Sequence, residues 1–421
     1  MKRLIKKLKI KRRAIATLAA MHFYGNPSSK LKIVGVTGTN GKTTTATLLY
    51  KIATELGFKT GLISTVENII VTEKRHATHT TPGPIPLNKL LSEMVDKGCI
   101  YVFMEVSSHA MDQKRVAGVN FIGGIFTNLT HDHLDYHKSF ENYFLAKKKF
   151  FQMLPSSAFA ISNGDDEHGR AIIENISAKK FLYGFMGGEP ARTTDVVQSG
   201  GEFHGEIKKL DFSGLELNIN GQDIKSKLLG KFNAYNLLAI WSACKLLGFD
   251  MDKVNKILEN IEPPKGRFDH FISNNGVLSI VDYAHTPDAL EKILLTIKEI
   301  KSKEGRVISV FGCGGDRDPL KRRIMGKIGA SLSDIAIITS DNPRSEDPER
   351  IIFEMKVDLT MTDLKKVKII ADRREAIKEA VNLAQNGDII LCAGKGHEEY
   401  QEINGVRHHF NDMEELRKFF N

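Results

Sequence analysis

Hydrophobic runs and amphipathic segments alternate along most of this 421-residue chain. Runs of β-branched and aromatic residues predict buried strands, and apolar positions at helical spacing predict the helices between them. In the first part of the chain, strands are expected at 33–36, 59–65, 100–105, 121–127 and 158–162, with β-rich sequence up to 229. Helices are expected at 44–56, in a segment ending at 97, at 143–151 and at 230–248. This alternation predicts an α/β fold with a mostly parallel sheet.

A second series of strands and helices begins after Pro263-Pro-Lys-Gly-Arg-Phe268, which is typical of a domain boundary. Strands are expected there at 277–281, 306–311, 335–339 and 388–393, and helices at 287–301, 323–333, 373–385 and from 412. We therefore predict a basic tail or helix at 1–30 and a central domain at 31–265. Because a glycine-rich turn, Thr37–Gly41, separates a strand from a helix in this central domain, we predict an ATPase domain of the P-loop type. A doubly wound, Rossmann-like C-terminal domain is expected at 266–421.

The segment between the first strand and the first helix has the pattern of a phosphate-binding loop. Glycines let backbone N–H groups point at an anion, and the helix N-terminus adds partial positive charge. Lys42 would reach the outer phosphates of a nucleotide, and Thr43 would bind Mg²⁺. The strict pattern has glycine at position 36, where this chain has Val36, and a fortuitous glycine-rich turn is the alternative. The residues expected at the nucleotide are Gly38, Thr39, Asn40, Gly41, Lys42, Thr43 and Thr44.

Two later strand ends carry side chains suited to a metal ion. Glu105 closes a hydrophobic strand, where a carboxylate is costly to bury unless it meets a cation. We expect it to bind Mg²⁺ opposite Thr43; an ion pair with an arginine is the alternative. Residues 131–137 hold three histidines and two aspartates. Zinc is the alternative metal here, although the chain has no CxxC or HExxH spacing.

The strands of the C-terminal part end in polar segments that are also rich in glycine. These segments are Asp282–Pro287, Gly312–Arg317, Asp341–Arg344 and Gly394–Glu398. Because ligands of open α/β sheets lie at the carboxyl ends of strands, they predict a ligand site. Arg317 and Arg344 supply forked donors for carboxylates. Nearer the middle of the chain, Asn233 and Asn236 would bond a purine edge or act only as helix caps.

The net charge of +9 belongs largely to the N-terminus, since residues 1–13 contain eight basic side chains and no acidic one. The rest is close to neutral, which argues against nucleic-acid binding. The tail is interpreted as a solvated basic helix or as a peripheral membrane contact through residues 1–20. A signal peptide around Ala14–Met21 is disfavoured because its apolar stretch is short. No apolar run reaches the roughly 18 residues needed to span a bilayer.

Four scattered cysteines, Cys99, Cys244, Cys313 and Cys392, argue against a disulfide framework. Their spacing fits neither a redox motif nor a zinc site. A reducing, cytoplasmic location is therefore expected.

Seven motifs together resemble the Mur ligase family, ATP-dependent enzymes that add amino acids to the peptidoglycan precursor, and most closely its MurE branch. They run in family order from about residue 22 to the end of the chain. The motifs are Thr37–Thr43, His79–Pro82, Glu105–His109, Thr127–Asp135, Asp282–Asp288, Asp341–Arg344 and Gly394–Glu398. The family's N-terminal domain, which holds the uridine diphosphate end of the substrate, has no counterpart in the sequence.

The resemblance implies roles at the matching positions. Catalytic roles fall to Lys42, His133 and Lys147, the last as a carbamylated lysine with Lys148 and Lys149 beside it. The metal ligands implied are Thr43, Glu105, His133 and Lys147. The muramoyl-dipeptide substrate is contacted by Thr80, Thr81, Ser107, Gln113 and Arg115. ATP is contacted by Asn233, Arg267 and Asp282. The incoming amino acid is held by Arg317, Asp341, Asn342, Pro343, Arg344, Gly394 and Glu398.

The implied reaction forms an amide through an acyl phosphate, with ATP and two Mg²⁺ ions. Asp-Asn-Pro-Arg at 341–344 is the form typical of enzymes that add meso-diaminopimelate, whose distal carboxylate the arginine grips. His131 and His285 are the candidates for the base that deprotonates the amine. The expected partners are these small molecules alone, with the protein a monomer. A folylpolyglutamate-synthase-like ligase and a non-catalytic, membrane-associated Mur-like protein are the alternatives.

Overall fold

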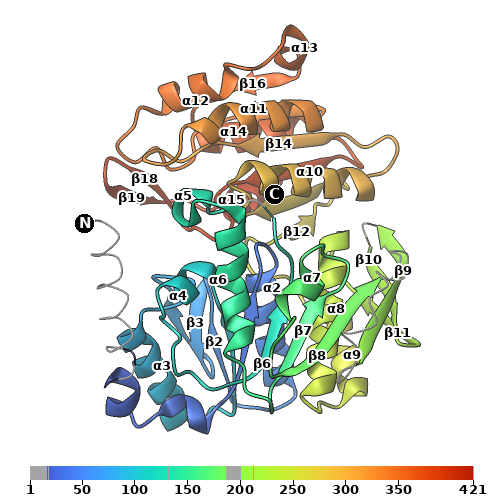
Figure 1. Cartoon of the computed structure of the whole chain (residues 1–421). Coiled ribbons are helices and arrows are strands. Elements are labelled where there is room, and N and C mark those ends of the chain that lie inside the picture. The colour runs from blue at the N-terminus through green and yellow to red at the C-terminus, as the bar shows by residue number, and fades with distance from the viewer. Residues whose placement is uncertain (1–16, 18, 131, 186–200, 212, 421) are drawn as a thin grey trace. The chain divides into compact units, whose positions relative to one another are not determined.

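The computed structural model describes residues 17, 19–130, 132–185, 201–211 and 213–420 (Figure 1). The candidate base His131 and the basic segment 1–16 lie outside the described residues. Contacts divide the chain into two compact units, residues up to 209 with 214–261, and residues 210–213 with those from 262 on. The predicted α/β class is confirmed, since each unit has helices packed around a largely parallel sheet.

An eleven-stranded sheet forms the centre of the first unit, in the order β11-β10-β9-β8-β7-β6-β1-β5-β2-β3-β4. The strand pairs from β9 through β8, β7, β6, β1 and β5 to β2 are parallel. Antiparallel pairs flank them at β2–β3, β3–β4 and β10–β11. The strands are β1 (Lys32–Thr37), β2 (Thr60–Ile63), β3 (Glu67–Ile70), β4 (Glu73–His76), β5 (Tyr101–Glu105), β6 (Phe121–Phe126), β7 (Phe159–Asn163), β8 (Lys179–Phe185), β9 (Glu202–Asp211), β10 (Gly214–Ile219) and β11 (Gln222–Ser226).

Helices cover both faces of this sheet. One face is packed by α3, α4, α6 and α7, and the other by α2 and α8, with α9 beside them. The helical segments are η1 (Pro27–Lys30), α2 (Lys42–Glu55), α3 (Pro84–Asp96), α4 (Ser108–Asp112), α5 (Leu134–His137), α6 (Phe140–Gln152), α7 (Gly169–Ile172), α8 (Lys231–Leu246) and α9 (Met251–Asn260).

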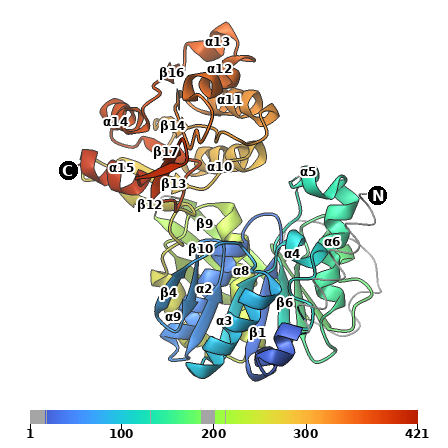
Figure 2. The ribbon, with the colours of Figure 1, turned by 90° about the vertical axis from the view of Figure 1, so that its left-hand side faces the viewer.

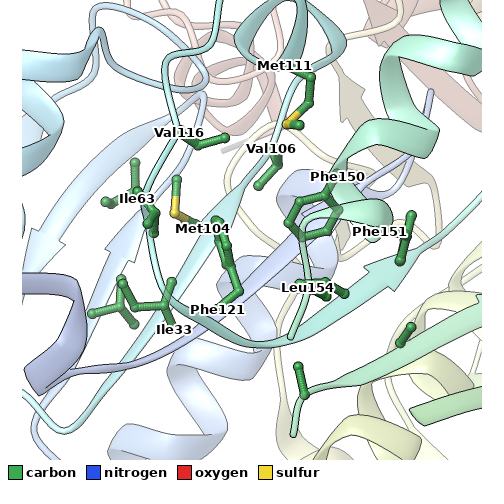
Figure 3. Close-up of a cluster of buried hydrophobic side chains, with 14 of the residues drawn as sticks. Ile33, Ile63, Met104, Val106, Met111, Val116, Phe121, Phe150, Phe151 and Leu154 are labelled. Atoms are coloured by element: carbon green, nitrogen blue, oxygen red, sulfur yellow. The ribbon is translucent and has the colours of Figure 1, made fainter. Parts of the chain in front are cut away.

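The core between the sheet and α6 explains why the central strands carry glycines. Figure 3 shows this cluster, with side chains such as Ile33, Met104 and Phe121 facing Phe150 of α6. A Cβ on Gly35 would lie only 2.5 Å from the ring of Phe150. The small residue in β1 therefore lets α6 approach the sheet closely, which brings the α6 side chains near the end of β1.

The second unit is a six-stranded sheet in the order β12-β13-β17-β14-β15-β16, parallel except for β12 against β13. Figure 2 shows α14 and α15 on one side of it and α10, α11 and α12 on the other, as in a doubly wound fold. The strands are β12 (Asp269–Ile272), β13 (Leu278–Asp282), β14 (Val307–Phe311), β15 (Ile335–Ile338), β16 (Val367–Ile369) and β17 (Ile389–Ala393), with a separate hairpin β18 (Tyr400–Ile403) and β19 (Val406–His409). The helices are α10 (Pro287–Ile300), α11 (Leu320–Leu332), α12 (Pro348–Lys356), α13 (Met361–Leu364), α14 (Arg373–Leu383) and α15 (Asp412–Phe420).

The sequence predicts a loop at the proline-rich segment 79–87 that leads into a helix, whereas α3 already begins at Pro84. Proline fits the first helical turn, where its missing N–H has no partner to lose. The helix predicted at 230–248 is confirmed as α8, and a further helix that was not predicted, α9, follows it and is capped by Asp250. Among the described residues, no helix has the length and hydropathy needed to cross a membrane.

Candidate active site

The loop between β1 and α2 has the geometry of a phosphate cradle. Gly38 has φ 154° and Gly41 has φ 83°, both in the region that favours glycine. A Cβ on Gly38 would lie 1.9 Å from Oγ1 of Thr127, and one on Gly41 would lie 2.5 Å from Oδ1 of Asn236. Helix α2 starts at Lys42 with no side-chain cap on its first N–H groups. These positions leave backbone donors at a helix N-terminus, which is the arrangement that binds anions.

The segment after β6 braces this loop from the side. Thr127 Oγ1 donates to the carbonyl of Asn40 at 2.6 Å. The side chain of Asn128 bonds the backbone of the same residue twice, because its Oδ1 accepts from the Asn40 N–H at 2.9 Å and its Nδ2 donates to the Asn40 carbonyl at 3.1 Å. Thr39 is held in the same way, since its N–H donates to Asn128 O at 2.8 Å. Every residue from 38 to 40 is thus in contact with residues 127–128.

Lys42 is half-buried and folds back over the loop. Its Nζ donates to the carbonyl oxygens of Gly38 at 3.0 Å and Thr39 at 2.8 Å. The ammonium group therefore lies above the cradle, where the charge of a polyphosphate would be concentrated.

Lys147 reaches the same loop from α6. Its side chain is buried, and its Nζ donates to Gly38 O at 2.6 Å and lies 4.6 Å from the centre of the Tyr143 ring. Burial, aided by the charge of Lys42 and opposed by Asp132, holds the pKa of the Lys147 amine well below its ordinary value. This shift favours the neutral, nucleophilic form of the amine relative to an exposed lysine.

Glu105 ends β5 beside β1, where its Cα pairs with that of Val36. The side chain is completely buried, and its carboxylate accepts from the N–H of Thr65 at 2.7 Å and from the Thr65 hydroxyl at 3.1 Å. Among the described residues, no arginine or lysine forms an ion pair with it, so the alternative of a structural Glu–Arg pair has no support in that part of the chain. These two donors from Thr65 are uncharged and do not balance the negative charge of the buried carboxylate, as expected of a cation ligand.

His133 lies in the histidine-rich segment with a left-handed backbone, φ 54°. Its Nε2 is 3.5 Å from Asp132 Oδ2, and its ring packs against His109 and Tyr143 with centroids 4.8 and 6.1 Å apart. Within the described ranges, no three His, Cys, Asp or Glu side chains gather as they would around a metal ion. A Mg²⁺ site built from Thr43, Glu105, His133 and Lys147 combines hard oxygen ligands with one imidazole, and a carboxylated Lys147 would add the oxygens that such an ion prefers.

The five residues expected at the acceptor substrate come together in one network. Thr81 Oγ1 donates to Glu105 O at 2.8 Å and accepts from the N–H of Ser107 at 3.1 Å. Arg115 donates through Nη1 to Thr81 O at 2.7 Å and through Nη2 to Gln113 Oε1 at 2.9 Å. The network also includes Thr80, whose hydroxyl is 3.0 Å from that of Thr65.

Asn233 and Asn236 are buried at the start of α8, and their side chains bond one another. Asn236 Nδ2 donates to Asn233 Oδ1 at 3.0 Å, and Asn233 Nδ2 donates to Leu229 O at 2.9 Å. Asn236 also lies against Gly41, as the close approach of its Oδ1 shows. These amides stabilise the helix start next to the phosphate loop; their contact with a purine stays a prediction.

In the second unit, Arg344 and Asn342 organise the loop after β15. Arg344 has φ 52°, and its Nη1 donates to Gly315 O at 2.7 Å. Asn342 is buried; its amide donates to Glu398 Oε2 at 2.8 Å and accepts from the buried Lys395 at 3.2 Å. Burial, with the charge of Asp341 nearby, raises the pKa of Glu398. The loop after β15 and the segment after β17 thus carry charged side chains of both signs, which suits a zwitterionic amino acid.

The remaining predicted residues of this unit lie around the same strand ends. A Cβ on Gly394 would lie 2.4 Å from Asp341 Oδ2, and one on Gly314 would lie 2.9 Å from Arg344 Nη1 and 3.8 Å from Cγ of the exposed Arg317. Asp282 accepts from the N–H of Phe268 at 2.7 Å, and burial raises its pKa while Arg267 opposes the rise. Arg267 itself stacks over the ring of Tyr283, 4.9 Å from its centre.

Sequence reasoning did not assign roles to Thr127, Asn128 and Lys395. Thr127 and Asn128 hold the phosphate loop, and Lys395 fixes Asn342 and Glu398. The sequence offered one clue, which is that each of these residues follows a predicted buried strand, in a segment that also contains assigned residues. This clue does not reveal a role, because a side-chain hydrogen bond to a backbone carbonyl leaves the spacing of hydrophobic residues unchanged.

Comparison with protein families matches most of the chain. Residues 36–244 match the model of the Mur ligase middle domain, and residues 266–396 match that of the Mur ligase, glutamate ligase domain. The first match includes the predicted site residues of its unit, and the second includes those of its unit except Glu398.

Curated relatives cover nearly all of this chain. The UDP-N-acetylmuramoyl-L-alanyl-D-glutamate--2,6-diaminopimelate ligase of Cytophaga hutchinsonii is 51% identical over 395 residues, which cover 94% of this chain and 79% of that protein. The protein of the same name from Bacteroides thetaiotaomicron is 51% identical over 402 residues, covering 96% and 81%.

Solved structures give the same picture. A structure of UDP-N-acetylmuramoyl-L-alanyl-D-glutamate--2,6-diaminopimelate ligase matches with a TM-score of 0.66 and 35% identity, covering 93% of this chain and 78% of that one. Folylpolyglutamate synthase from Thermotoga maritima matches with a TM-score of 0.68 but 16% identity, covering 90% of each chain, and so shows the fold alone.

Proposed function

The chain belongs to the Mur ligase family, and from that premise we propose that it acts as a 2,6-diaminopimelate-adding ligase of the MurE type. It joins diaminopimelate to the D-glutamyl carboxylate of UDP-N-acetylmuramoyl-L-alanyl-D-glutamate at the expense of ATP, in peptidoglycan synthesis. The observation that carries the proposal is identity of about half the residues to relatives of that name, with an intact phosphate loop and the Asp341–Arg344 motif in place.

The reaction has two chemical steps. An oxygen of the glutamyl carboxylate attacks the γ-phosphorus of ATP; the bond to the β-phosphate oxygen breaks, and ADP leaves. The amine of diaminopimelate then attacks the acyl carbon of the acyl phosphate. Inorganic phosphate leaves, the amine loses a proton, and an amide forms. His285 stays a candidate for the proton acceptor, as does His131, which lies outside the described residues.

Positioning and neutralisation of phosphate charge carry most of the catalysis in such a transfer. The N–H groups at the start of α2 and the ammonium of Lys42 face the phosphates. Bound Mg²⁺ neutralises charge on the phosphate oxygens. We assign its ligands, for two ions, to Thr43, Glu105, His133 and Lys147.

Lys147 fits the carbamate role for a chemical reason. A neutral amine adds to CO₂ and releases a proton, giving an anionic carbamate, whereas an ammonium has no lone pair for that reaction. The lowered pKa of the buried Lys147 supplies the neutral form. The carbamate would place an anionic group with two oxygen atoms at the metal site, where it would attract Mg²⁺ more strongly than the neutral amine does.

Recognition of the two organic substrates is assigned to separate groups. Thr80, Thr81, Ser107, Gln113 and Arg115 hold the muramoyl dipeptide, with Arg115 supplying charge for a carboxylate. Arg344 binds the distal carboxylate of diaminopimelate, a group that lysine lacks. The rest of that pocket consists of Arg317, Asp341, Asn342, Pro343, Gly394 and Glu398. Further nucleotide contacts come from Asn233, Asn236, Arg267 and Asp282.

The proposal also covers the oligomeric state, the location and the domain limits of the protein. We propose a monomer in the cytoplasm that works on small molecules, with residues 1–20 available for peripheral contact with a membrane. The domain limits 31–265 and 266–421 mark its nucleotide-binding and amino-acid-binding parts.

One assay tests the function directly. The protein is incubated with ATP, Mg²⁺, UDP-N-acetylmuramoyl-L-alanyl-D-glutamate and either diaminopimelate or lysine, and the products are weighed by mass spectrometry. The expected product is the diaminopimelate amide, with one ADP and one phosphate formed for each amide. Formation of no amide with either amino acid, by protein that binds ATP, would contradict the proposal.

A further inference from the structure

The turn Asn163–Asp166 directly after β7 has no part in the function proposed above, yet its side chains reach the segment after β6. Asn163 Nδ2 donates to Thr127 O at 2.9 Å, and Asp166 Oδ2 accepts from the N–H of Leu129 at 2.9 Å. From β8, the hydroxyl of the buried Tyr183 donates to Phe126 O at 3.2 Å. Side chains from one turn and one strand therefore hold three peptide groups within residues 126–129.

That same segment forms the side wall of the phosphate loop. Thr127 Oγ1 and the amide of Asn128 bond the peptide of Asn40, and Asn128 O accepts from the N–H of Thr39. The loop is thus attached to residues whose own backbone is fixed from the other side by Asn163 and Asp166. Two consecutive layers of hydrogen bonds connect the turn to the phosphate cradle.

The turn itself has little freedom to move. Gly164 N–H donates to Tyr183 O at 2.7 Å, and Gly169 N–H donates to Asp166 O at 2.8 Å. A Cβ on Gly169 would lie 1.6 Å from the carbonyl oxygen of Asn163, so α7 is packed directly on the turn. A rigid turn can impose its geometry on the segment that it holds.

Each carboxylate oxygen of Asp166 accepts a hydrogen bond from a backbone N–H group. Its side chain is 10% exposed, and its second oxygen, Oδ1, accepts from the N–H of His168 at 2.9 Å. Both carboxylate oxygens therefore face backbone N–H donors, an arrangement that an amide of the same shape cannot satisfy. Loss of one acceptor leaves a poorly solvated N–H without a partner, which is costly.

We propose that Asn163 and Asp166 are positioning residues for ATP. By fixing residues 127–129 they hold Thr127 and Asn128 where these keep the phosphate loop open for the nucleotide. The inference rests on the proposed role of that loop in binding ATP. Neither side chain touches the nucleotide itself; both act through the segment after β6.

The variants Asp166→Asn and Asn163→Asp test this proposal at each of the two positioning residues. The first turns an acceptor into a donor facing an N–H, and the second places a carboxylate oxygen against the carbonyl of Thr127. Each variant should raise the Kd of a non-hydrolysable ATP analogue, measured by calorimetry, and the KM for ATP by roughly tenfold. The KM for diaminopimelate should stay unchanged, because its pocket lies in the other unit.

Asp165→Asn is the matched control in the same turn. Asp165 Oδ2 accepts from the N–H of Phe185 at 2.8 Å and from the hydroxyl of Tyr235 at 2.9 Å, not from residues 126–129. This variant should bind the analogue with the affinity of the unmodified protein, even if thermal unfolding shows a comparable loss of stability.

The outcomes separate positioning from a general structural role. If Asp166→Asn and Asn163→Asp bind the analogue as tightly as the unmodified protein, and only kcat falls with the fraction of folded protein, the proposal is overturned. If the unmodified protein binds no ATP analogue, that result contradicts the proposed function, and the positioning role of Asn163 and Asp166 is contradicted with it.

Discussion

The side-chain nitrogens of Lys42 and Lys147 share one acceptor, the carbonyl oxygen of Gly38, at 3.0 and 2.6 Å. Burial lowers the pKa of the Lys147 amine well below its ordinary value, and the nearby charge of Lys42 adds to this effect. The shift favours the neutral amine of Lys147, which is the form that carbamylation requires.

Replacement of Lys147 by alanine should lower kcat by about two to three orders of magnitude, since it removes the anionic ligand of the metal site. Formate or acetate should restore part of the activity, because a small carboxylate can occupy the vacated space. Steady-state assays with and without added carboxylate measure this.

Lys149→Ala serves as the control for this variant. Lys149 is exposed on the same helix, so its loss should leave kcat nearly unchanged. Equal losses in the two variants would show that the carbamate was assigned to the wrong lysine.

Burial of Lys147 should also make stability depend on pH. The unfolded chain binds a proton at this lysine up to about pH 10.4, whereas the folded chain releases it at a lower pH. The unfolded state therefore binds more protons between these two values, and the free energy of unfolding rises with pH across that window. Urea denaturation in CO₂-free buffer at pH 7 and pH 9 should show this rise, and Lys147→Met should reduce it. Equal slopes for the two proteins would contradict the burial argument.

Glu105→Gln should separate metal binding from folding. Glutamine can keep one hydrogen bond with Thr65 and removes a buried charge, so the thermal midpoint without Mg²⁺ should be unchanged or higher. The Mg²⁺ concentration for half-maximal activity should rise by roughly tenfold or more, because a carboxylate ligand is lost. A wild-type Mg²⁺ dependence in this variant would remove Glu105 from the metal site.

Arg344→Ala should selectively impair the use of diaminopimelate. Loss of one partner of a desolvated charge pair costs about 2–5 kcal/mol, which corresponds to a loss of tens- to several-thousand-fold in kcat/KM. Arg323→Ala is the control. It removes an exposed arginine whose Nε lies 3.8 Å from Oδ2 of Asp358, and it should have little effect on kcat/KM. Undiminished use of diaminopimelate by Arg344→Ala would show that the distal carboxylate is bound elsewhere.

The elements around the candidate site follow from local sequence. The β-branched run before Gly38 and the helical spacing after Lys42 predict β1 and α2, because buried parallel strands and amphipathic helices have different apolar periods. Short helices such as α4 and α5 were not predicted, since they lie in polar segments where apolar spacing gives no signal. The edge strand β16 was missed for a similar reason, as two of its three residues are exposed.

Prediction of the site was limited by contacts between distant segments. Glu105 was expected at the metal because it closes a hydrophobic strand, a feature of the sequence itself. The attachment of Asn40 to Asn128, in contrast, depends on β1 and β6 lying side by side, and no spacing within either segment encodes it. Hydrogen bonds of this kind become visible only when the order of strands in the sheet is known.

The close approach of Gly38 to Thr127 has a consequence for sequence variation. Any side chain at position 38 would overlap the Thr127 hydroxyl and would also adopt an unfavourable backbone conformation. A smaller residue at position 127 would relieve the overlap but would lose the hydrogen bond to Asn40. Substitutions at positions 38 and 127 are therefore coupled, although the two residues are far apart in the chain. We expect the phosphate loop to be among the segments of the chain that accept the fewest substitutions during evolution.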